Sequence, residues 1–187
     1  MASALVPILR GAGYRKEQRT FRRASPECVQ VVNVQLSQWG SRTSQQFTVN
    51  LGVFFPEVHE ALAGYLQVRI GQAGPTEYQC QIRQRLGMLM PGNRDVWWGI
   101  EAGREPSGIS RKVGEAMTAY GLPWLEGMAV LETARREVER WAPLQALGFD
   151  IAAGDTDRAQ RRFRELLTGN AAPKKLRSWG RAHGLLE

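Results

Sequence analysis

The sequence predicts an α+β fold, in which an antiparallel sheet packs with helices and is followed by an α-helical C-terminal part. Apolar and polar residues alternate in two neighbouring segments, 29–36 and 47–55, as expected of strands joined in a hairpin. After residue 101 the apolar residues recur every three to four positions, as they do in helices. We therefore expect residues 1–100 to form the sheet layer and residues 101–187 the helical part, packed as one compact domain.

The first hundred residues predict a short helix, several strands and one further helix. The spacing of apolar residues indicates a helix that begins near Leu5 and ends at Gly11. Pro56 is expected to start the second helix, over 57–66, and Trp97-Trp98 to open a last short element. The alternating segments predict strands over 20–23, 29–36, 47–55 and 78–86.

The alternation also predicts how the two strands of the hairpin pair. Antiparallel pairing must put apolar side chains opposite apolar ones, so the numbers of paired residues must add up to an odd value. We therefore expect Leu36 opposite Phe47 or Val49, and Gln35 opposite Thr48 or Asn50. The apolar face is formed by Val32, Val34, Leu36, Phe47, Val49, Leu51, Val53 and Phe55.

The C-terminal part shows several helical stripes separated by helix-ending residues. Gly121 is expected to end the first helix, and Pro123 to start the next. The segment 154–157 combines a break with a helix-capping residue, and Pro173 opens a last helix. The apolar stripes consist of Val113, Ala116, Met117 and Tyr120, of Leu131, Ala134, Val138 and Trp141, of Ala159, Phe163, Leu166 and Leu167, and of Leu176 and Trp179.

The net charge of +7 and the pI of about 10.0 raise the question of a polyanionic partner. The basic residues concentrate at the two ends of the chain. Aromatic residues do not alternate with them as they do in single-strand-binding platforms, so we do not expect nucleic acid as a partner. The two clusters are Arg10, Arg15, Lys16, Arg19, Arg22 and Arg23, and Arg158, Arg161, Arg162, Arg164, Lys174, Lys175, Arg177 and Arg181.

The sequence favours a cytoplasmic protein without a membrane segment. Two cysteines, Cys28 and Cys80, are too few for a disulfide scaffold. No apolar run reaches the roughly 18–20 residues of a membrane helix. The apolar N-terminus has no basic residue before it and contains Pro7, so we do not expect a signal peptide.

Motifs of known enzyme classes are absent from the sequence. There is no phosphate loop, no H-E-x-x-H, no C-x-x-C pair and no G-x-S-x-G elbow. With only two histidines, His59 and His183, we expect no metal site and no cofactor. His59 with Glu57 or Glu60 as a metal site, or with a cysteine as a catalytic dyad, remains a weaker alternative.

The candidate site is the polar face of the sheet. Amides and a hydroxyl project from one face of the hairpin, and two arginines project from one face of the following strand. If these faces coincide, two guanidiniums lie beside an amide row and can hold a carboxylate or a phosphate. The alternative is that this face binds nothing and is only the solvent-exposed side of an ordinary antiparallel sheet. The candidate binding residues are Asn33, Gln35, Thr48, Asn50, Arg83, Arg85, Trp97 and Trp98.

The function favoured by these patterns is a non-enzymatic binding module, with a protein as the partner. A second hypothesis is an anion- or nucleotide-directed enzyme, with Arg83 and Arg85 as a clamp beside a carboxylate such as Glu77 or Asp95. It predicts a concave pocket at the arginines. A third is a nucleic-acid accessory protein, which requires both basic clusters to lie on one face.

The order of several short motifs resembles the bacterial family known as domain of unknown function 4304, over roughly the first hundred residues. This resemblance implies the α+β fold and a bacterial origin but no activity. Many relatives are expected to have a histidine where this chain has Gln81. The motifs are Gly13-Tyr14-Arg15-Lys16, Phe21-Arg22, residues 32–37, residues 47–53, residues 80–87 and Trp97-Trp98.

Overall fold

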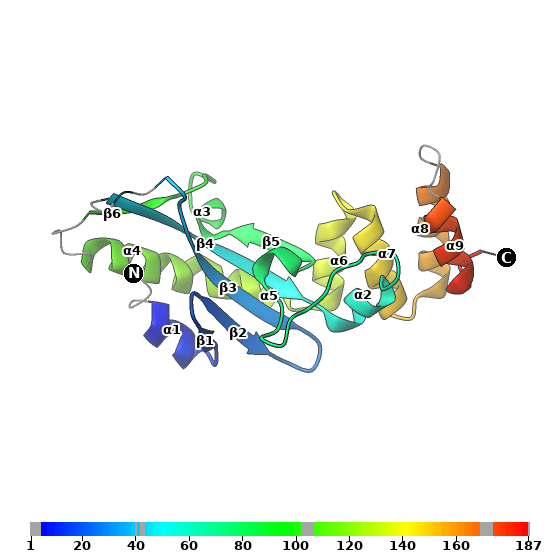
Figure 1. Ribbon diagram of the computed structural model, residues 1–187, viewed down its shortest axis with the longest axis horizontal. Helices are drawn as coiled ribbons and strands as arrows, with labels where there is room; N and C mark the ends of the chain where they lie inside the picture. The colour runs from blue at the N-terminus through cyan, green and yellow to red at the C-terminus, as the bar shows by residue number, and fades with distance from the viewer. Residues whose placement is uncertain (1–4, 40, 42–43, 102–106, 169–173, 187) are drawn as a thin grey trace.

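The computed structural model describes residues 5–39, 41, 44–101, 107–168 and 174–186, and their centre is a six-stranded antiparallel sheet (Figure 1). The strands follow one another in the order β1-β2-β3-β4-β5, and β6 pairs with β4. The strands are β1 (Arg15–Glu17), β2 (Thr20–Ala24), β3 (Val29–Leu36), β4 (Ser44–Phe54), β5 (Ile82–Arg85) and β6 (Trp98–Glu101).

Helices precede, connect and follow the strands, which confirms the predicted α+β class with a helical C-terminal part. No helix in the described part of the chain has the length and apolar character needed to cross a membrane. The helices are α1 (Leu5–Gly11), α2 (Pro56–Ala61), α3 (Leu86–Leu89), α4 (Ser107–Ala116), α5 (Leu122–Met128), α6 (Leu131–Glu139), α7 (Pro143–Ala152), α8 (Thr156–Thr168) and α9 (Lys174–Ala182), with a 3₁₀ turn η1 (Glu77–Gln79) and a π-helical turn η2 (Met117–Gly121).

The pairing of β3 with β4 confirms the predicted register. Leu36 lies opposite Phe47, and Gln35 lies opposite Thr48. One face of the sheet is therefore apolar, and it packs against α1, α4, α5, α6 and α7 in the main core (Figure 1). This core includes Phe21, Val32, Val49, Leu51 and Val53 from the sheet, and Leu9, Val113, Met117, Leu125, Val138 and Phe149 from the helices.

A second, smaller core joins α8 and α9 to the rest of the molecule. These two helices lie at one end of the long axis (Figure 1). Phe163 of α8 and Trp179 of α9 are buried, and their ring centroids are 6.1 Å apart. They pack against Leu147 of α7 and Leu62, which follows α2. The stripes predicted on α8 and α9 therefore bury one face of each helix, as amphipathic helices do. Tyr120 and Trp141, which end the two preceding stripes, are instead 36% and 55% exposed.

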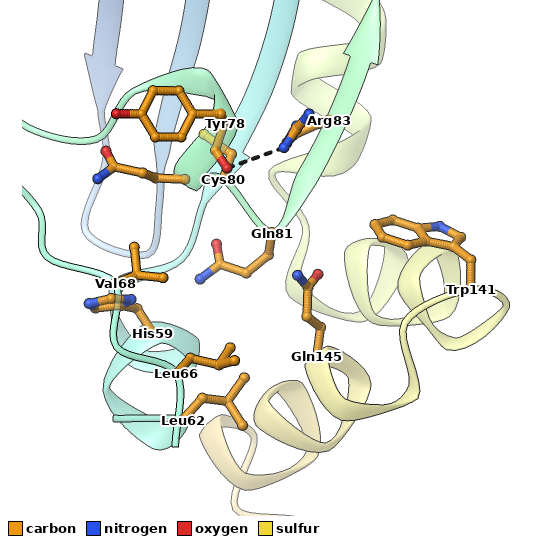
Figure 2. Close-up of a pocket in the computed structure, with 11 residues that line it drawn as sticks. His59, Leu62, Leu66, Val68, Tyr78, Cys80, Gln81, Arg83, Trp141 and Gln145 are labelled. Atoms are coloured by element: carbon orange, nitrogen blue, oxygen red, sulfur yellow. Dashed lines mark hydrogen bonds between the residues drawn. The ribbon is translucent and has the colours of Figure 1, made fainter. Parts of the chain in front are cut away.

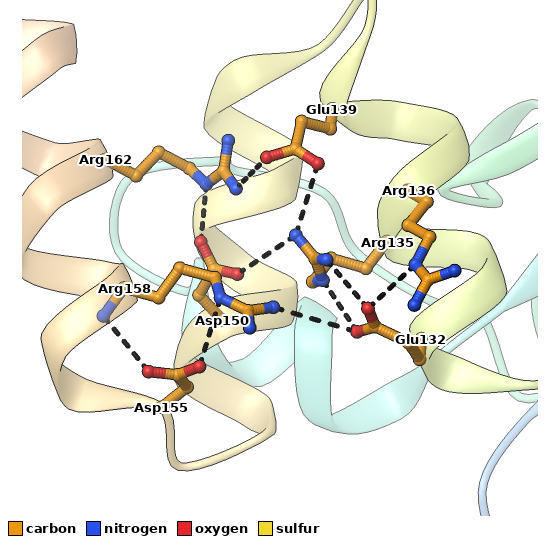
Figure 3. A network of polar contacts seen from close by, with 8 residues as sticks. All are labelled: Glu132, Arg135, Arg136, Glu139, Asp150, Asp155, Arg158 and Arg162. Atoms are coloured by element: carbon orange, nitrogen blue, oxygen red, sulfur yellow. Dashed lines mark hydrogen bonds and ion pairs between the residues drawn. The ribbon is translucent and has the colours of Figure 1, made fainter.

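A network of ion pairs links α6, α7 and α8 beside this second core (Figure 3). Its centre is Asp150, whose side chain is 0% exposed and accepts a hydrogen bond from Arg162 Nε. Arg135 Nη1 lies 3.8 Å from the other carboxylate oxygen of Asp150. On the solvent-exposed side of the network, hydrogen bonds from Arg135 lower the pKa of Glu132 to about 2. Glu139 on the same side accepts a hydrogen bond from Arg162 at 2.7 Å.

Two elements predicted in the middle of the chain differ from the structure. The helix expected over 57–66 ends at Ala61, because the chain turns at Gly64 with a positive φ of 79°. The strand expected over 78–86 is shorter: η1 replaces its beginning, and pairing starts only at Ile82. Side-chain and backbone bonds between Thr76 and Gln79 form a capping box that favours this turn.

One further expectation about local structure was wrong, and one strand was not expected. Gly121 does not end a helix; its φ is −67°, and the chain continues through η2 into α5. A Cβ at this position would lie 2.6 Å from Met117 Sδ, so the glycine permits close packing instead of a left-handed turn. Strand β1, which the sequence analysis did not predict, has three exposed residues and no apolar alternation.

Gln81 has a structural role at the beginning of β5. It is 6% exposed; its side-chain oxygen accepts a hydrogen bond from Phe55 N at 2.8 Å, and its Nε2 donates to Phe55 O at 3.2 Å. These two bonds join the end of β4 to the segment that leads into β5. At the position where many relatives are expected to have histidine, this chain has an amide that binds both polar groups of one backbone residue.

We expect Gln81→Leu to lower the free energy of unfolding by about 1–3 kcal/mol, because the buried N–H of Phe55 loses its acceptor. Urea denaturation measures the change. The matched control is Gln84→Leu, which removes an acceptor of the Arg85 backbone N–H at a half-buried position. Equal losses in the two variants would contradict the role assigned to Gln81.

Candidate functional site

The predicted amide row and both arginines project from the same face of the sheet. Asn50 of β4 lies opposite Asn33 of β3 on one side and Arg85 of β5 on the other. Because side chains alternate along each strand, Gln35, Thr48 and Arg83 share this face. The structure thus brings six of the eight candidate residues together on one surface, the polar face, formed by Asn33, Gln35, Thr48, Asn50, Arg83 and Arg85.

The centre of the polar face is a depression of about 220 Å³. Asn50 Nδ2 donates a hydrogen bond to Gln35 Oε1 at 2.8 Å, so the NH₂ group of Gln35, which is exposed, stays available as a donor. Both guanidiniums line this depression, which is formed by Gln35, Asn50, Leu51, Glu77, Arg83, Gln84 and Arg85.

The two arginines differ in how far they are already paired. Arg85 forms an ion pair with Asp95, and its guanidinium lies 5.4 Å from the ring centroid of Trp97. Arg83 is exposed and donates one hydrogen bond, to the backbone oxygen of Tyr78 at 3.2 Å. Among the described residues Arg83 forms no ion pair. A guanidinium has five N–H groups, so Arg83 is the arginine with donors to spare.

Trp97 and Trp98 point to different environments, as expected of neighbours in extended chain. Trp97 is half-buried, and its Nε1 donates to Asp95 at 3.3 Å, which places it beside Arg85. Trp98 lies opposite Phe47 in the pairing of β6 with β4 and packs against that ring in the main core, with centroids 5.7 Å apart. Trp98 is therefore not on the polar face, whereas six of the other candidate residues are.

The polar face is also less exposed to solvent than the outer face of an ordinary antiparallel sheet. Thr48 is 0% exposed, and its hydroxyl has no hydrogen-bond partner in the described part of the chain. Asn50 is buried as well, at 7% exposure. These two side chains form the base of the face, while Gln35, Arg83 and Arg85 reach its surface.

One end of the polar face is covered by the chain that precedes β5. Cys80 packs directly over Gly52 of β4, where a Cβ would lie 2.7 Å from the sulfur. With Val31 and Phe54 it forms a small apolar cluster against Ile70. In a regular strand over 78–86 Cys80 would share the face of Ile82; it lies on the opposite side because η1 replaces the beginning of that strand.

Both cysteines are buried and free, and burial makes their thiols less acidic. Burial raises the pKa of the Cys80 thiol, and burial also raises that of Cys28, where a hydrogen bond with Ser25 acts in the opposite direction. High thiol pKa values disfavour the nucleophilic thiolate. Across the described ranges, no three or more His, Cys, Asp or Glu side chains are placed to hold a metal ion.

The family model described as Domain of unknown function (DUF4304) matches residues 5–127, which is more than half of the chain. The chain belongs to this family. No curated protein and no solved structure matches the chain. The DUF4304 match contains the whole sheet and the polar face, whereas α6 to α9 lie beyond it.

The two terminal basic clusters lie on different elements of the fold. The first lies on α1, β1 and β2 within the DUF4304 region, and the second lies on α8 and α9, far away along the long axis (Figure 1). Arg158 and Arg162 of the second cluster turn inward and pair with Asp155, Asp150 and Glu139 (Figure 3).

Proposed function

We propose that this DUF4304 protein is a binding module whose polar face takes an acidic side chain of a protein partner. The observation that carries the proposal is the strand register, which aligns Arg83 and Arg85 with Gln35 and Asn50 around one depression. Charge-assisted hydrogen bonds from a guanidinium to a carboxylate are among the strong polar contacts at protein interfaces.

A single carboxylate fits the charge of the depression better than a phosphate dianion. Asp95 already neutralises Arg85, and Glu77 adds a second carboxylate to the lining. Of the two arginines that line the depression, Arg83 is the one that forms no ion pair with a described residue. The volume of about 220 Å³ also lies below the roughly 300–1,000 Å³ of small-molecule pockets, which favours the end of a side chain over a complete metabolite.

We expect the double variant Arg83→Ala/Arg85→Ala to lose at least about tenfold of its affinity for the partner, because truncating a buried charged contact costs about 2–5 kcal/mol. The measurement is retention of proteins from the native host lysate, quantified by mass spectrometry. Arg111→Ala is the matched control, since Arg111 is an exposed arginine of α4 that lies 3.8 Å from Glu115.

A protein retained by the wild type and by Arg111→Ala, but lost from the double variant, is the expected result. An identical set of retained proteins in all three samples would contradict the proposal. Urea denaturation of each variant shows that the fold is preserved.

A second candidate, an anion- or nucleotide-directed enzyme, is favoured by one observation: both guanidiniums line the same concave surface. It differs from the first in its response to inorganic phosphate. Saturable shifts of the Arg83 and Arg85 Nε–Hε signals in NMR titrations with phosphate, and not with acetate, would support this candidate over the binding module.

A further inference from the structure

Arg83 also lines a second, larger cavity of about 440 Å³, next to the polar face (Figure 2). Three parts of the chain that are distant in sequence form it: α2 with the segment that follows it, the segment from η1 into β5, and the region around the turn between α6 and α7. The volume lies within the range that binding pockets commonly have.

Exposed apolar side chains gather at the mouth of this cavity. Val68 is 39% exposed, Tyr78 is 64% exposed and Trp141 is 55% exposed. They are half of the six large hydrophobic side chains recorded as exposed in the described part of the chain. Trp, Tyr and Arg are the residues enriched at interface hot spots, and the lining of this cavity contains one of each, Trp141, Tyr78 and Arg83.

The inner wall of the cavity has a buried acceptor without a partner. Gln145 Oε1 is buried and has no hydrogen-bond partner among the described residues. Figure 2 shows the Gln145 amide directed into the cavity toward Gln81, whose own amide is engaged by the Phe55 backbone. Leaving such an acceptor unpaired costs about 1–3 kcal/mol.

We propose that this cavity anchors an apolar side chain of the same partner segment whose carboxylate binds at the depression. This inference rests on the proposed function. Because Arg83 lines both hollows, one short segment can place an acidic residue at Arg83 and an apolar residue between Val68, Leu66 and Trp141. The partner is thus a protein segment in which a large apolar residue and an Asp or Glu lie within a few positions of each other.

Site-specific photocrosslinking in the native host tests this assignment. p-Benzoylphenylalanine replaces Tyr78 at the cavity mouth, Gln35 at the depression, or Tyr120, an exposed aromatic residue of η2 that serves as the control. Mass spectrometry identifies each crosslinked peptide. We expect positions 78 and 35 to crosslink to one segment containing a large apolar residue within about three positions of an Asp or Glu, and position 120 not to do so.

The variant Trp141→Ala supplies the second measurement. Trp141 is more than half exposed, so its removal leaves the fold intact, and the yield at position 78 should fall at least about tenfold. A small-molecule adduct, a segment without the apolar residue, or an unchanged yield in Trp141→Ala would overturn the cavity assignment. Crosslinking at position 35 without crosslinking at position 78 would overturn the cavity assignment and leave the proposed function in place. No crosslinking at either position would overturn both the cavity assignment and the proposed function.

Discussion

Asp150→Ala should lower the free energy of unfolding by about 3–5 kcal/mol, among the largest losses expected from a single substitution in this chain. The carboxylate of Asp150 is fully buried and pairs with Arg162, and Arg135 lies 3.8 Å from it. Both arginines are nearly buried, with side chains 9% and 10% exposed. Removing the carboxylate takes away the buried partner of both arginines and leaves them only Glu132 and Glu139, which are 47% and 44% exposed.

Arg136→Ala is the matched control for this prediction. Arg136 belongs to the same network and binds Glu132 at 3.0 Å, but its side chain is 72% exposed. Exposed ion pairs contribute about 0–1 kcal/mol, so urea denaturation should show at most a small loss. A loss in Asp150→Ala no greater than that in Arg136→Ala would show that the buried pairs do not hold α6, α7 and α8 together.

Phe163→Ala should also cost about 3–5 kcal/mol, because it removes the largest fully buried side chain of the second core. Phe163 is 0% exposed and packs between Trp179 and the backbone of α9 at Gly180. A Cβ at position 180 would lie 2.1 Å from Phe163 Cζ, so this contact requires glycine. The loss should appear in thermal or urea unfolding followed by tryptophan fluorescence.

Gly180→Ala provides the coupled measurement. In the wild type the added methyl group collides with the Phe163 ring and should cost about 1–3 kcal/mol. In the Phe163→Ala background the ring is gone, so the same change should cost much less. Additive losses in the double variant would contradict the direct contact between the two positions.

The parts of the fold that the sequence predicts well are those in which one local period determines burial. Alternation in β3 and β4 has a period of two, and pairing apolar with apolar leaves Leu36 opposite Phe47 or Val49. The helical stripes of α6, α8 and α9 are equally local. A three-residue exposed strand such as β1 has no such period, and its pairing depends on β2.

Positions governed by distant side chains were not predictable from local pattern. Gly121 resembles a helix end, yet it is required by Met117 and by Leu86 of α3. Cys80 follows the strand alternation in sequence, but its sulfur covers Gly52 on the other side of the sheet. In both cases a tertiary contact decides the conformation, and the neighbouring residues alone do not indicate it.

In the candidate site, too, some features follow from the local sequence period and others from tertiary packing. Strand phase grouped Arg83 with Arg85, and Gln35 with Asn50, but only the pairing of β4 with β5 places the two groups on one face. The depression depends on how η1 folds back, and the cavity depends on Trp141, which α6 brings to Arg83 from 58 residues further along the chain. Folding of connecting segments over a sheet is set by tertiary packing, so the sequence indicated the face and not its hollows.

The most direct test of the proposed carboxylate site is a charge exchange across the interface. Once the partner segment is identified, its Asp or Glu is changed to Lys and combined with Arg83→Glu/Arg85→Glu, and the affinities of all four pairings are measured by calorimetry. We predict that each single-sided reversal weakens binding at least about tenfold, and that the double exchange restores most of the loss. Exchanged proteins that bind no better than the single-sided variants, or reversals that leave the affinity unchanged, would contradict a carboxylate held at Arg83 and Arg85.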